Sequence, residues 1–167
     1  MYVDGYKRPK GLKITFSNLT ILLFIKILKI AALLIDLLNK LNSYLQLLSL
    51  RCGVFIVMVM WTLDKFVNPG HSARIFEHFY GISGSTDTIA YILGALQLLL
   101  VIAFLVGIKK RITYGAIFIM HGLSTLSSYN QYIDGFNNLL FFAAWPMWAA
   151  CFALYLLRDQ DVKFTIK

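Results

Sequence analysis

The 167-residue chain is unusually apolar and carries few charges. Apolar residues make up 59% of it and charged residues 14%, against roughly 45–50% and 25% in globular domains. This composition excludes intrinsic disorder, argues against a water-soluble domain and favours lipid as the solvent. The formal net charge is +8. We expect no nucleic-acid partner, because the basic residues flank apolar runs instead of forming one folded basic face.

The first 44 residues predict a basic tail followed by an amphipathic helix. Residues 1–16 form the tail, which we expect in the cytoplasm. In residues 17–44 five polar side chains share an arc of about 100° with a broad Leu and Ile face opposite, a pattern typical of a helix lying on a membrane surface. These polar residues are Lys26, Lys29, Asp36, Lys40 and Ser43. The alternative, a fifth span, would place the basic tail outside, against the orientation bias of membrane proteins.

Four apolar runs further along the chain are long enough to cross a bilayer, which takes about 20 residues as a helix. They are Leu45–Leu63, Ile89–Ile108, Ile112–Ser128 and Leu139–Leu157. The basic residues between and after them cluster on one side, which predicts that both termini are cytoplasmic. The predicted fold is therefore an all-α, multi-pass membrane protein. Residues 45–158 form its four-helix bundle, and residues 159–167 form a cytoplasmic tail.

A charged and turn-forming motif marks the outer end of the first run. Asp64 and Lys65 close the run, and Asn68 and Pro69 open a turn. Residues 72–80 then predict a short amphipathic helix over the outer mouth of the bundle. The simplest role of Asp64 and Lys65 is to anchor the first span at the membrane interface.

Arg51 is the one charged residue inside the predicted spans, about two turns into the first of them. Ionisable residues at membrane depth are costly and are candidates for a functional role. Its long side chain could extend to the cytoplasmic surface, or it could point into the bundle and meet a polar partner from another helix. Both interpretations remain open at this point.

A polar stripe runs along the third span, and a glutamine lies at similar depth in the second. The stripe consists of His121, Ser124, Thr125 and Ser128, and the glutamine is Gln97. We expect the stripe to face the bundle interior, where a hydrogen bond between Gln97 and His121 is plausible. The polar groups either satisfy one another as contacts between helices or form a quinone or proton site.

The chain carries no recognisable catalytic or cofactor-binding motif. Cys52 and Cys151 form no paired motif, and His71 and His78 are a weak metal signal. No glycine-rich nucleotide loop or catalytic triad is present either. We therefore expect no catalytic residues, no metal site and no intrinsic cofactor, although a quinone could bind.

The order of these features resembles the DoxX family of small bacterial membrane proteins. The resemblance rests on Leu50-Arg51, on Leu63-Asp64-Lys65-Phe66 and on Asn68-Pro69, and it covers residues 48–158. It implies a four-helix bundle in the bacterial inner membrane with a redox-associated role, as in a subunit of thiosulfate:quinone oxidoreductase. By position, Arg51 and Lys65 look like the family's basic residues at the two ends of the first helix. Members often carry a glycine just before that lysine and an acidic residue in the second helix, where this chain has Thr62, Leu63 and Gln97.

The function expected from this resemblance is that of an accessory or anchoring subunit of a quinone-linked or oxidative-stress redox system. Besides the lipid bilayer, such a subunit has a protein partner that supplies the redox chemistry. One alternative is a quinone-reactive oxidoreductase subunit that uses Arg51, Lys65, Gln97 and His121. A small membrane transporter is the other alternative, in which the polar stripe would line a path.

Overall fold

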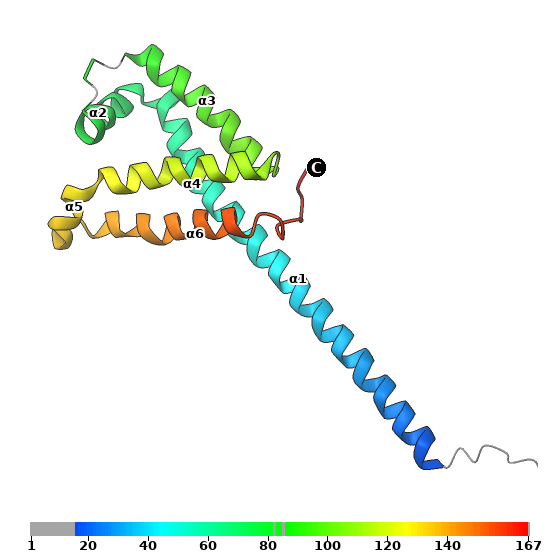
Figure 1. Cartoon of the computed structure of the whole chain (residues 1–167). Helices are drawn as coiled ribbons and strands as arrows, with labels where there is room; N and C mark the ends of the chain where they lie inside the picture. The colour runs from blue at the N-terminus through cyan, green and yellow to red at the C-terminus, as the bar shows by residue number, and fades with distance from the viewer. Residues whose placement is uncertain (1–15, 82, 85, 167) are drawn as a thin grey trace, which may run out of the picture. The chain divides into compact units, whose positions relative to one another are not determined.

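The computed structural model describes residues 16–81, 83–84 and 86–166, and side-chain environments from residue 21 onward. In this part of the chain every regular element is a helix, so the all-α prediction is confirmed (Figure 1). The predicted basic tail lies outside the described residues except for its last residue, which begins the first helix. The elements are α1 (Phe16–Val67), α2 (Pro69–Tyr80), α3 (Asp87–Leu105), α4 (Lys110–Ser127), α5 (Tyr129–Ile133), η1 (Gly135–Asn137), η2 (Leu139–Ala143) and α6 (Ala144–Leu156).

The chain forms two compact units, residues 1–41 and residues 42–167. In the first unit, α1 leaves every described side chain exposed, both the Leu and Ile residues and the lysines. The sequence pattern divides this region at residue 44, but α1 continues through that boundary without a break. Residues 41–48 contain no glycine or proline, so nothing in them ends a helix. The placement of residues 17–44 on a membrane surface stays a prediction.

In the second unit, α4 and α6 are antiparallel neighbours and pack through small residues on α4 (Figure 1). A Cβ on Gly115 would lie 3.2 Å from the ring of Tyr155, and one on Gly122 would lie 2.6 Å from Nε1 of Trp148. That indole nitrogen also donates to the carbonyl of Phe118, at 3.2 Å. Because aromatic rings of α6 occupy the space above both glycines, the two helices approach closely, as membrane helices often do.

The short helices match the turn-forming residues of the sequence. Asn68 separates α1 from α2, Pro69 occupies the first position of α2, and Gly81 ends it in the left-handed conformation with φ of 67°. Proline suits a first helical position and glycine suits a left-handed helix end. The predicted outer helix therefore exists, and it begins three residues before the predicted start.

Within the described ranges, two helical stretches are long and apolar enough to cross a membrane, Asp87–Leu105 and Leu139–Leu156. They correspond to the second and fourth predicted spans. The fourth begins as the 3₁₀ helix η2 and continues as α6, with Pro146 in the first turn of α6. A proline is tolerated there because the first turn needs no backbone N–H donor. That these two stretches and the other two predicted runs, in α1 and α4, cross a membrane stays a prediction.

Candidate functional site

Arg51 points into the second unit and is almost completely buried, with 1% of its surface exposed. Its Nη1 donates to Oδ2 of Asp161 at 3.1 Å and to the hydroxyl of Tyr114 at 3.2 Å. The Tyr114 hydroxyl in turn donates to the same Asp161 oxygen, at 2.8 Å. The structure thus favours the inward orientation of Arg51 over extension of its side chain to the surface.

The described residues of the predicted cytoplasmic tail, 159–166, fold back onto the helices. Asp161 is fully buried, and the backbone N–H of Ile166 donates to the carbonyl of Val106 at 2.8 Å. Arg51 also donates through Nη2 to the carbonyl of Lys163, and Lys110 donates to the carbonyl of Asp161. These contacts join α1, α4 and the turn after α3 to a single segment, residues 159–166, which we call the C-terminal segment.

Sequence reasoning missed Asp161 as the partner of Arg51. The signal that could have found it is electrostatic, because a buried guanidinium needs a counter-ion and few acidic residues lie on the predicted cytoplasmic side. In the described part of the chain, Nε of Arg51 and Oδ1 of Asp161 are buried without a hydrogen-bond partner. Arg51 and Asp161 therefore retain one further hydrogen-bond donor atom and one further acceptor atom besides those used in their ion pair.

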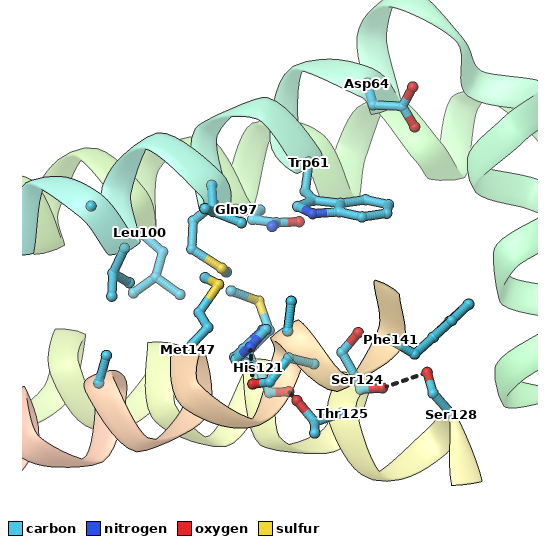
Figure 2. Close-up of a pocket in the computed structure, with 18 of the residues that line it drawn as sticks. Trp61, Asp64, Gln97, Leu100, His121, Ser124, Thr125, Ser128, Phe141 and Met147 are labelled. Atoms are coloured by element: carbon cyan, nitrogen blue, oxygen red, sulfur yellow. Dashed lines mark hydrogen bonds between the residues drawn. The ribbon is translucent and has the colours of Figure 1, made fainter. Parts of the chain in front are cut away.

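A cavity of about 1400 Å³, open to the outside on part of its boundary, lies in the second unit and is lined by residues of α1, α2, α3, α4, η2 and α6. Its walls are mainly apolar, and it exceeds the roughly 300–1,000 Å³ of typical small-molecule pockets. The whole polar stripe of α4 lines it, as does Gln97 of α3. Figure 2 shows Gln97 and Trp61 on one side of this cavity and His121 on the other. Arg51 is not part of the lining, so the predicted polar site divides into two clusters.

Two hydroxyls of the stripe donate to backbone carbonyls of α4 itself. Thr125 donates to the carbonyl of His121 at 2.8 Å, and Ser128 donates to that of Ser124 at 3.2 Å (Figure 2). Such bonds to a carbonyl four residues earlier are a common way for a hydroxyl to be satisfied in a helix. These two bonds lie within one helix, so they satisfy the hydroxyls without joining α4 to a neighbouring helix.

His121 and Gln97 line the same cavity, but the hydrogen bond between them that the sequence suggested is not formed. Nε2 of His121 instead donates to the carbonyl of Ala144 at 3.3 Å. A neutral imidazole that donates through Nε2 keeps Nδ1 as an acceptor. Gln97 is half-buried on the opposite wall, and its side-chain amide offers two N–H donors and a carbonyl. The cavity therefore has an imidazole on one wall and a side-chain amide on the facing wall.

The outer-end motif lies beside the cavity, which Asp64 and Lys65 help to line. Oδ2 of Asp64 lies 2.7 Å from Nδ1 of His71, and Nζ of Lys65 donates to the carbonyl of Trp61 at 3.0 Å. Burial lowers the pKa of Lys65, and the neighbouring carboxylate of Asp64 opposes that shift. The Asp64–His71 contact links α1 to α2 across Asn68, a role that the sequence pattern did not reveal.

Among the described residues no group of three or more His, Cys, Asp or Glu side chains is arranged to hold a metal ion. Cys52 and Cys151 are free thiols. Comparison with known proteins finds no family model, no curated protein and no solved structure that matches the chain. The resemblance to the DoxX family therefore rests on the sequence motifs alone.

Proposed function

We propose that this chain is a DoxX-like, multi-pass protein of the bacterial inner membrane that serves as an accessory or anchoring subunit of a redox system. In this arrangement both termini lie in the cytoplasm, and the four crossings are residues 45–63 of α1, α3, α4, and η2 together with α6. The outward faces of the helices support a lipid environment. Leu99 on α3 and Ile119 on α4 are 68% and 60% exposed, and many other large apolar side chains share this exposure. An apolar surface this extensive is unusual for a soluble monomer.

The observation that carries a quinone-linked role is the cavity between Gln97 and His121. A quinone has two ring carbonyls and an apolar tail, and its reduced form has two hydroxyls. The Gln97 amide N–H can donate to a carbonyl oxygen, and Nδ1 of His121 can accept from a hydroxyl. The remaining walls are apolar enough for the tail. Binding rather than catalysis is the role we assign to this chain, with electrons supplied by the partner protein.

The accessory role is tested by copurification. The affinity tag belongs at the N-terminus, because the C-terminal segment is docked against α1 and α4. Extraction from native membranes in mild detergent, followed by mass spectrometry, is expected to give an oxidoreductase in stoichiometric amount. A chain that purifies alone from freshly prepared native membranes would contradict the accessory role.

A second candidate, a quinone-reactive subunit, is favoured by the same pair of facing groups. Replacing His121 with Leu removes the acceptor, and Gln97→Leu removes the donor. Loss of one hydrogen bond, about 1 kcal/mol, lowers the affinity for quinone about fivefold, and the retained quinone falls with it. Quinone is measured by organic extraction of the purified protein. Ser127→Ala is the matched control, because Ser127 is exposed on α4 and does not line the cavity. Equal quinone content in all variants would exclude both quinone roles.

A further inference from the structure

The N-terminal part of α1 is a long helix whose apolar side chains nothing covers within its own unit. Between residues 21 and 41 every side chain is exposed, including Leu33 at 69% and Leu38 at 62%. Exposed apolar surface of this extent requires a covering partner or a lipid phase. The partner has to fit both the apolar face and the cations beside it.

The positive charge of the first 41 residues indicates which kind of partner covers the helix. Seven basic and two acidic residues give the first 41 residues a formal charge of +5, which is most of the chain's +8. The helix carries Lys26, Lys29 and Lys40 within one arc, together with Asp36. A second copy of this unit would bring the same positive charge and be repelled. An anionic leaflet offers the opposite charge, and each lysine near such a surface strengthens binding about fivefold.

We propose that the N-terminal unit is a docking element for anionic phospholipid. Its Leu and Ile face lies among the acyl chains, and Lys26, Lys29 and Lys40 contact the headgroup phosphates. An apolar helix face combined with a basic cluster gives two independent contributions to membrane affinity. Long lysine side chains reach the headgroups while their methylene groups stay on the apolar side. The proposal rests on the membrane placement of the protein and assigns a lipid class to its N-terminal unit.

The test places a spin label on either side of this helix in the full-length protein, with both native cysteines replaced by alanine. Leu38→Cys lies on the apolar face. Leu33→Cys is the matched control, about 140° away round the helix at about 100° per residue, on the lysine side. A third label, Leu99→Cys on α3, reports whether the bundle is in the bilayer. The protein is reconstituted into liposomes of phosphatidylcholine alone or mixed with an equal amount of phosphatidylglycerol.

Accessibility to a water-soluble paramagnetic reagent is then measured at each label. In liposomes that contain phosphatidylglycerol we expect the label at 38 to be protected and the label at 33 to remain accessible. Replacing Lys26, Lys29 and Lys40 together with Gln should lower the ratio of docked to free helix about a hundredfold in these liposomes, and added salt should act in the same direction. In phosphatidylcholine alone the same substitutions should have little effect.

Three results would overturn the proposal. One is equal protection at 38 in the wild type and the triple lysine variant in both lipids. Protection at both 33 and 38 in both lipids would show a fifth span. Spin–spin broadening at 38 that disappears on dilution with unlabelled protein would show pairing with a second copy. Exposure of the label at 99 would refute the membrane placement itself, which separates failure of the proposed function from failure of this inference.

Discussion

Replacing Asp161 with Asn is expected to destabilise the protein strongly, because it leaves the buried guanidinium of Arg51 without a counter-ion. Removing one partner of a buried ion pair costs about 3–5 kcal/mol. The side-chain amide of the new Asn keeps an oxygen that can accept the hydrogen bond from Tyr114. The expected loss of unfolding free energy is therefore at the lower end of that range, about 3 kcal/mol. The neighbouring substitution Asp159→Asn is the matched control. Asp159 is 88% exposed and lies 3.9 Å from Arg158, so its loss should cost less than about 1 kcal/mol.

The measurement is equilibrium unfolding of both variants in mixed detergent micelles, followed by circular dichroism. A double variant, Arg51→Gln with Asp161→Asn, removes both charges and should recover part of the lost stability, because no uncompensated charge remains buried. Equal unfolding midpoints for the Asp159 and Asp161 variants would refute the reasoning. A double variant less stable than Asp161→Asn alone would show that the penalty does not come from the unpaired charge.

Two further substitutions test the packing and the hydrogen bonds of the second unit. Gly122→Ala should lower the free energy of unfolding by about 1–3 kcal/mol, because the added methyl would overlap the indole of Trp148. Gly53→Ala is the control: no atom lies within 4 Å of its new Cβ, so it should be neutral or stabilising by up to about 1 kcal/mol. Equal thermal stability of the two variants would disprove the close approach of α4 and α6. Tyr114→Phe removes the hydroxyl that donates to Asp161, and a loss of about 1–2 kcal/mol in the same unfolding assay is expected. An unchanged midpoint would show that this hydroxyl bond adds nothing to the ion pair.

The elements that could be predicted are those with a local signal. The apolar runs gave the positions of α3 and α4 to within a few residues, and the helix predicted over residues 72–80 matches α2 except for its first three residues, which the sequence pattern assigns to a turn. These signals are local because propensity and turn formation depend on residues that are close together in the chain. The polar stripe was expected to face the bundle interior because such a stripe gains little from lipid, and its residues line the cavity.

What could not be predicted depends on contacts between distant residues. The Arg51–Asp161 pair joins positions 110 residues apart, and nothing near Asp161 marks it as buried. His121 bonds to a backbone carbonyl in α6 instead of to Gln97, because the rotation of α4 against its neighbours decides which groups come within reach. The position of the cavity likewise follows from the way the helices pack, which periodicity alone does not determine.

The paired glycines of α4 determine which walls of the cavity can move. Gly115 and Gly122 are seven residues apart, and so are Tyr155 and Trp148, the aromatic residues that face them from α6. Two matched contacts at the same spacing favour one relative position of these helices along their axes, because a shift by one turn would place each ring against a larger side chain instead of a glycine. The α4–α6 pair thus acts as a stiff frame that carries His121. If the cavity changes width, α1 and α3 are then the helices that move. Because Arg51 of α1 is hydrogen-bonded to Asp161 and Lys163, a movement of α1 would strain the contacts of the C-terminal segment.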